Sequence, residues 1–279
     1  MNKGRSTARG VATLMASSLS NQLGAASGSL AFPAIGPLGV VAVRQLIAAA
    51  VLLPIARPRF RSFTRQQLWP VLLLAVVFGT MNLGLYSAIE RIGLGLAVTL
   101  EFLGPLSIAL FGARSKAGAS CALAATAGVV AITQPGPSTD YLGIAMGLVG
   151  AASWASYILL NRTIGQRIPG IEGTAAAMAV SATAFLPVAV VILLSRPVDW
   201  FVIVCAVSAG VLASAVPYIA DLLALRHVPA GLFGILMSVN PVFAALIGLL
   251  ALGQSLDLLQ WAGILVIVAA NAAVLRLRH

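Results

Sequence analysis

Residues 88–112 read AIERIGLGLAVTLEFLGPLSIALFG, and residues 224–248 read ALRHVPAGLFGILMSVNPVFAALIG. Laid on each other without gaps, the two stretches match at positions that include Ala88 with Ala224, Gly95 with Gly231, Leu100 with Leu236, Pro105 with Pro241, Ala109 with Ala245 and Gly112 with Gly248. Coincidence stays open in a sequence rich in alanine, leucine and glycine. The matched prolines in the middle of apolar segments favour a duplicated unit.

The composition around these stretches excludes a soluble protein. Of the 279 residues, 60% are apolar and 9% are charged, and the mean hydropathy is +1.02. A soluble domain carries about a quarter charged residues, so this chain lacks the polar side chains that would cover a globule in water. The net charge of +10 lies in short clusters between apolar runs, which argues against a nucleic-acid partner. The composition therefore predicts an integral membrane protein that lies in a lipid bilayer.

Ten stretches are apolar enough to cross a bilayer as helices, since a span needs about 20 residues. They are 11–32, 38–56, 68–88, 95–113, 117–134, 142–160, 173–194, 200–225, 231–251 and 257–275. Membrane strands are not expected, because the alternation of apolar and polar residues that they need is absent. The expected fold is an all-α membrane protein with ten transmembrane helices.

Lysine and arginine residues define the expected orientation. With the N-terminus inside, all but three of the 17 fall in inside segments, and the exceptions are Arg44, Arg91 and Arg196. The positive-inside rule then places both termini in the cytoplasm. The first 32 residues also resemble a cleaved signal peptide, but an uncleaved first span is favoured.

Ten spans and one repeat divide the chain into two five-helix units, residues 1–134 and 135–279. Because five is an odd number, the second unit must cross the membrane in the opposite sense to the first. Inverted repeats of this kind are found in many secondary transporters.

Prolines lie at matching points of the two units. Pro105 and Pro241 each remove a helical donor, which frees the carbonyls of Glu101 and Met237 and kinks the helix. Pro217 is a third expected kink. Freed carbonyls persist in hydrocarbon only where protein or a water-filled cavity satisfies them, so the kinks predict an internal site.

Three ionisable residues fall inside predicted spans, namely Arg44, Glu101 and Asp221. Each costs about 2.5 to 3.5 kcal/mol to insert and needs a partner or water. Arg44 and Glu101 lie at nearly equal depth, so we expect them to pair, either as a substrate and proton-coupling site or as a structural ion pair. Asp221 lies near a cytoplasmic helix end, where it could belong to the site or reach solvent.

Neutral polar residues complete the expected substrate cavity. Gln22 and Asn82 fall at the depth of the expected ion pair, and Asn240 directly precedes a mid-span proline. Tyr218 shares a helix face with the buried aspartate. Tyr157 is interpreted as a packing or interface residue.

No metal or cofactor is expected. Cys121 and Cys205 lie in separate apolar segments, and His227 and His279 have no second ligand at metal spacing. A phosphate-binding loop and the HExxH and GxSxG motifs are absent from the sequence, so neither ATP hydrolysis nor an intramembrane enzyme is expected.

Three runs of sequence resemble the drug/metabolite transporter superfamily in its EamA branch, and within it the threonine/homoserine exporter group. They are Ala97–Leu106, Pro217–Asp221 and Phe233–Pro241. The resemblance covers nearly the whole chain and implies two EamA repeats, a bacterial inner-membrane location and a small-molecule substrate. Asn240 and Gln254 depart from it, because both stand where that family has acidic residues.

The resemblance also implies export of a small amino acid, such as threonine or homoserine, by proton antiport. Arg44 can hold a carboxylate in a two-pronged contact, whereas Glu101 can hold an ammonium group or a proton. Two alternatives stay open. One is the same fold carrying a nucleobase or a cationic drug, and the other is a membrane partner protein that transports nothing.

Overall fold

The structure is a computed structural model that describes residues 3–113, 115–196, 198–252 and 255–276. Within these residues the chain is helical and contains no strand, which confirms the predicted all-α class. The helices are α1 (Lys3–Ser29), α2 (Phe32–Ala56), α3 (Arg65–Ile92), α4 (Leu94–Phe111), α5 (Lys116–Thr133), α6 (Tyr141–Arg167), α7 (Glu172–Ser195), α8 (Trp200–Gly210), α9 (Val216–His227), α10 (Ala230–Leu236), α11 (Val239–Leu252) and α12 (Leu258–Arg276). Two short turns complete them, the 3-10 turn η1 (Phe60–Ser62) and the wide π-helical turn η2 (Val211–Ala215).

Eight helical rods in the described chain are long and apolar enough to cross a membrane. Two of them are compound. α8, η2 and α9 follow one another without a break, and α10 and α11 are separated by a turn at Met237 and Ser238. The predicted spans 11–32 and 95–113 correspond to α1 and α4, which are helical but are not among the eight. The total of ten spans therefore stays a prediction.

Side-chain caps fix several helix ends. Ser115, Asp140 and Asp199 each accept a hydrogen bond from a backbone amide three residues later, as N-cap residues do. Asp140 also pairs with Arg91 at the end of α3, with 3.0 Å between Nε and Oδ2. The hydrogen bond from the Gly143 amide and then the Arg91 guanidinium lower the pKa of Asp140. The start of α6 is thereby tied to the end of α3.

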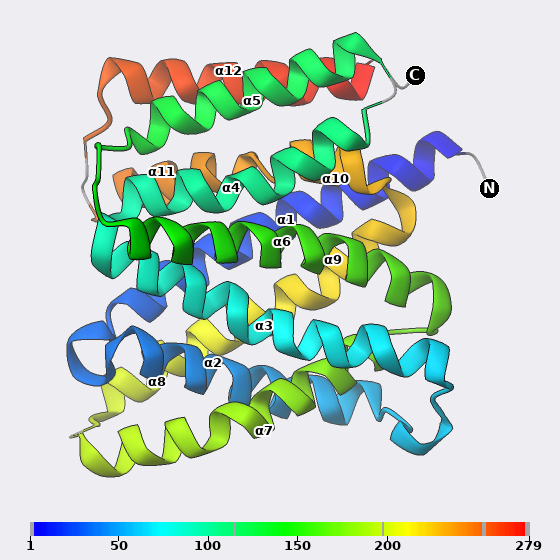
Figure 1. The fold of residues 1–279 in the computed structure, drawn as a ribbon, viewed down its shortest axis with the longest axis vertical. Helices are drawn as coiled ribbons and strands as arrows, with labels where there is room; N and C mark the ends of the chain where they lie inside the picture. Colours follow the sequence, from blue (N-terminus) through cyan, green and yellow to red (C-terminus); the bar gives the residue numbers. More distant parts are fainter. Residues whose placement is uncertain (1–2, 114, 197, 253–254, 277–279) are drawn as a thin grey trace.

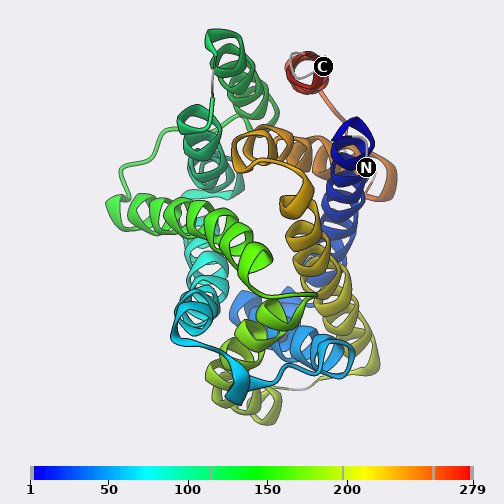
Figure 2. The ribbon, with the colours of Figure 1, turned by 90° about the vertical axis from the view of Figure 1, so that its right-hand side faces the viewer.

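Both chain termini lie at the same end of the rods (Figure 1). The connections α2–α3, α4–α5, α6–α7 and α9–α10 lie at this end as well. We call it the basic end, because these connections and the helix turns beside them carry Arg57, Arg59, Arg61, Arg65, Lys116, Arg162, Arg167 and Arg226. Figure 2 looks onto the basic end and shows α5 and α12 side by side at one edge, with α7 at the opposite edge. The charge rule assigns the basic end to the cytoplasm, and this orientation remains a prediction.

Thiol labelling tests the orientation. In a chain whose two native cysteines are replaced, Ser62→Cys at the basic end is expected to react with a membrane-impermeant maleimide only when the cytoplasmic side is open to the reagent. Thr139→Cys, in the exposed α5–α6 connection at the opposite end, is expected to react in intact cells. Labelling of Ser62→Cys in intact cells would overturn the topology.

The packing of the rods supports the two-unit organisation. In two units of five rods, α2, α4 and α5 correspond to α7, α10–α11 and α12, and each packs against its own counterpart. Other contacts occur in matching pairs. α3 packs on α6 as α8–α9 packs on α1, and α4 packs on α6 as α11 packs on α1. We therefore propose that residues 1–134 and 135–279 are two inverted units.

Small residues bring neighbouring rods to backbone contact. A Cβ added to Gly84 of α3 would lie 2.9 Å from backbone atoms of α6 that include the nitrogen of Gly150. A Cβ added to Gly104 of α4 would overlap the carbonyl oxygen of Ala151, also on α6. Close backbone approach of this kind drives helix association where no hydrophobic effect operates. α6 is thus fixed tightly between α3 and α4.

Candidate functional site

Arg44 of α2 is buried, and each of its three guanidinium nitrogens has a partner. Nε donates to Oγ of Ser214 at 3.1 Å, and one terminal nitrogen donates to the carbonyl oxygen of Ala213 at 2.6 Å. The other terminal nitrogen donates to the hydroxyl of Tyr86 on α3 at 3.1 Å. The guanidinium therefore joins α2 and α3 to the wide turn η2.

Pro217 explains why donors gather at η2. Proline has no N–H, so carbonyls one turn before it lose a helical donor. The carbonyl of Leu212 accepts instead from Ser20 of α1 at 2.7 Å, and that of Ala213 accepts from Arg44. The wide turn lies directly before Pro217. Its free carbonyls are thus satisfied by side chains from two other rods.

The expected ion pair between Arg44 and Glu101 is wrong. In the part of the chain that the structure describes, the one ion pair joins Arg91 to Asp140, and the guanidinium of Arg44 is occupied by η2 and Tyr86. The physical reason is that carbonyls without a donor are available acceptors beside Arg44. Equal depth in two helices does not by itself turn two side chains toward each other.

Asp221 of α9 lies at a junction of three rods. Its carboxylate accepts a hydrogen bond from Oγ of Ser17 on α1 at 2.6 Å and another from the hydroxyl of Tyr157 on α6 at 2.9 Å. The residue is only 7% exposed, so the alternative that it reaches solvent is wrong. Tyr157 is a buried packing residue, as predicted, and its hydroxyl is in addition one of the two donors.

Three aromatic rings pack on one another near Asp221, and one of them belongs to its donor Tyr157. The ring centroids of Phe78 and Tyr218 are 4.4 Å apart, and those of Tyr157 and Tyr218 are 5.9 Å apart. Phe78 comes from α3, Tyr157 from α6 and Tyr218 from α9. We call the three rings with Asp221 the aspartate cluster.

Tyr218 connects the aspartate cluster to Arg44. Its hydroxyl faces the side chains of Asn82 and Ser214, and the guanidinium of Arg44 is close enough to act on it electrostatically. Asn82 is held in turn by a hydrogen bond from Nδ2 to the carbonyl of Phe78 at 2.8 Å. Tyr218 is thus near the buried cation Arg44, and the buried anion Asp221 lies one turn further along α9.

Glu101 of α4 is the second buried carboxylate, at 8% exposed. A Cβ added to Gly150 of α6 would lie 3.6 Å from its Cγ. Among the described residues, no hydrogen bond or ion pair reaches its carboxylate. Gly150 and Tyr157 are seven residues apart on α6, so Glu101 and Asp221 contact this helix at points separated by roughly 10 Å. The two carboxylates thus lie at different levels along α6.

Gln22 and Asn240 form a further polar contact between α1 and α11. Nε2 of Gln22 donates to Oδ1 of Asn240 at 3.4 Å, and Nδ2 of Asn240 donates to the carbonyl of Met237 at 3.0 Å. This is the carbonyl that Pro241 deprives of its helical donor. Gln254, the other position that departs from the family pattern, lies outside the described residues.

The predicted site residues form separate groups instead of one layer. Arg44 lies with Asn82 and Tyr218, Gln22 lies with Asn240, and Glu101 lies in a helix that continues through Pro105 without a break. The hydroxyls of Ser17, Tyr86 and Ser214 also belong to these groups and were not predicted as site groups from the sequence. The one available signal was that a buried hydroxyl needs a partner, which does not say which partner.

In the described ranges, no group of three or more His, Cys, Asp or Glu side chains could hold a metal ion. Ionisable residues inside apolar rods mark substrate and ion paths, and interrupted helices accompany such sites in transporters. The fold and the buried groups together define a multi-pass membrane transport protein.

Known proteins resemble the chain over nearly all of its length. Residues 141–276 match the EamA-like transporter family. The threonine/homoserine exporter RhtA of Escherichia coli strain K12 is 31% identical over 264 residues, which cover 94% of this chain and 89% of the exporter. RhtA of Salmonella typhimurium strain LT2 matches to the same extent. A crystal structure at 21% identity covers 99% of both chains with a TM-score of 0.79, which shows a shared fold.

The chain belongs to the EamA-like transporter family. It is a multi-pass protein of the inner membrane, and its substrate is a small molecule.

Proposed function

We propose that the protein exports small amino acids, such as threonine or homoserine, in exchange for protons. The observation that carries this proposal is a pair of buried carboxylates, Glu101 and Asp221, at different depths along α6, with the buried cation Arg44 nearby. The substrate class is supported by the threonine and homoserine in the name of the RhtA relatives.

A zwitterionic substrate matches the opposite charges of Arg44 and Asp221, which both lie near Tyr218. Its ammonium group would meet Asp221 and the ring faces of the aspartate cluster, which attract cations. Its carboxylate would meet Arg44 in place of the uncharged hydroxyl of Tyr86. A guanidinium–carboxylate contact adds the attraction of opposite charges to the hydrogen bond and can be bidentate, so the substrate can displace that hydroxyl while Arg44 keeps its bonds to η2.

Proton coupling is assigned to Glu101. Asp221 already has two hydroxyl donors, whereas Glu101 has none among the described residues. A buried carboxyl without a donor is neutralised most simply by a proton. Antiport results if the protein binds substrate at Asp221 and a proton at Glu101 in turn. It also requires that each of the two conformations of the protein opens these groups to only one side of the membrane.

Flux into proteoliposomes tests the proposal. Labelled threonine and homoserine are expected to move faster when a pH gradient is imposed than when it is collapsed with an ionophore, and protein-free liposomes set the background. A nucleobase and a quaternary ammonium drug serve as comparison solutes. Flux of a comparison solute without flux of either amino acid would overturn the substrate class, and amino-acid flux that ignores the gradient would overturn proton coupling.

A further inference from the structure

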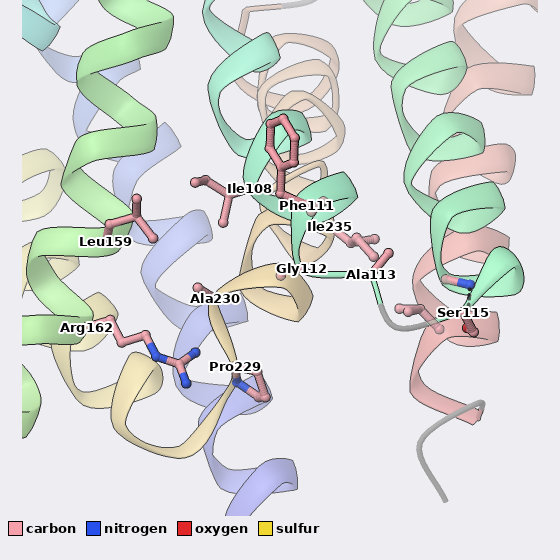
Figure 3. Close-up of a pocket in the computed structure, with 14 residues that line it drawn as sticks. Ile108, Phe111, Gly112, Ala113, Ser115, Leu159, Arg162, Pro229, Ala230 and Ile235 are labelled. Atoms are coloured by element: carbon pink, nitrogen blue, oxygen red, sulfur yellow. Dashed lines mark hydrogen bonds between the residues drawn. The ribbon is translucent and has the colours of Figure 1, made fainter.

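A large cavity opens beside the basic end (Figure 3), and neither of the two buried carboxylates lines it. Its volume is about 930 Å³, and residues of α4, α5, α6, α10 and α12 line it. The walls are chiefly apolar, with Ile108, Leu159 and Ile235 among them. Phe111, at the end of α4, is 91% exposed, and Leu159 is 48% exposed. Such side chains on apolar rods would lie against hydrocarbon in a membrane.

Arg162 of α6 is the charged residue of this lining, among the residues that the structure describes. Its half-buried guanidinium has no hydrogen bond or ion pair in the same residues, and Figure 3 shows it lying toward the α9–α10 connection near Pro229. Neighbouring arginines differ. Arg167 donates to the carbonyl of Gln66, and Arg226 donates to the carbonyl of Gly165. Arg162 is thus a cation held at an apolar cavity without a protein acceptor.

We propose that this cavity binds an anionic phospholipid, with the phosphate on Arg162 and an acyl chain along the apolar wall. Arg162 lies five residues before the end of α6, roughly 7.5 Å along the helix, a depth close to the headgroup region of a rod that spans the bilayer. A basic pocket between transmembrane helices on the cytoplasmic side is suited to an anionic headgroup. The exposed apolar walls fit an acyl chain better than a small zwitterion.

Native mass spectrometry of the purified protein tests this site. Wild-type protein in mixed micelles is expected to retain phosphatidylglycerol in preference to phosphatidylcholine with the same acyl chains. Arg162→Gln is expected to lower the affinity for phosphatidylglycerol about fivefold, the effect of one interfacial charge, and to leave phosphatidylcholine unchanged. Arg162→Lys keeps the charge and is expected to retain most of the preference.

Arg61→Gln is the matched control, because it removes the same charge from the exposed turn η1 at the basic end, outside the cavity lining. It is expected to bind phosphatidylglycerol as the wild type does. Equal loss in Arg61→Gln and Arg162→Gln would overturn the site, and so would equal retention of the two lipids by wild-type protein. Displacement of phosphatidylglycerol by free threonine would also overturn it, since the cavity would then be a carboxylate site for cargo. None of these readings requires transport activity.

Discussion

Glu101→Gln is expected to abolish the proton-driven part of amino-acid flux in proteoliposomes, so that an imposed pH gradient no longer changes the rate. Glutamine keeps the size of glutamate but can neither take up nor release a proton. Because no hydrogen bond of the described residues depends on this carboxylate, the variant is expected to fold. Substrate exchange without a gradient is expected to persist, since Asp221 and Arg44 are unchanged.

The control for Glu101→Gln is Glu90→Gln, the same substitution at an exposed position near the end of α3. It is expected to respond to the gradient as the wild type does. A wild-type response in Glu101→Gln would make Glu101 structural, and Asp221→Asn would then be the variant that tests coupling. Thermal unfolding of each purified variant separates lost coupling from lost fold.

Gly104→Ala is expected to lower the stability of the protein by about 1–3 kcal/mol, the usual cost of forcing an extra carbon into a packed interior. The added Cβ would overlap the carbonyl oxygen of Ala151, and this backbone atom cannot rotate away as a side chain can. α4 and α6 would have to separate. The measurement is the unfolding midpoint in detergent, followed by fluorescence-detected size exclusion.

Gly136→Ala provides the comparison for Gly104→Ala. A Cβ at Gly136 would meet nothing within 4 Å, so this variant is expected to unfold at the wild-type midpoint. If both variants unfold at the wild-type midpoint, the close contact between α4 and α6 does not contribute to the stability of the protein.

The sequence was most informative about the rods themselves. The length and hydropathy of a segment can be read without knowing its neighbours in space. For this reason a helix could be predicted over the stretch 200–225, and this stretch is helical. The wide turn inside it was not predicted, because a π turn has no compositional signal and only Pro217 pointed to a distortion. α6 likewise extends past the predicted end at residue 160 to Arg167, since a helix at a membrane surface tolerates charged residues.

The contacts of the candidate site were beyond sequence reasoning for a different reason. Ser17 meets Asp221 across 204 residues, and Tyr157 meets it across 64. No local pattern encodes which faces of three rods meet. Arg44 shows the consequence, because depth alone suggested Glu101 as its partner while the acceptors freed by Pro217 were closer.

The two interrupted rods, α8–α9 and α10–α11, differ in which helices donate hydrogen bonds to their free carbonyls. This difference determines where the molecule can bend. At η2 the donors come from α1 and α2, so separating these helices from the turn would strand two acceptors at about 1–3 kcal/mol each. At Met237 the donor is Asn240, which is three positions further along the same rod. That carbonyl keeps its donor through a swing of the whole segment. We therefore expect α1, α2 and α8–α9 to travel as one rigid block during a transport cycle, and the articulation to lie between α10 and α11.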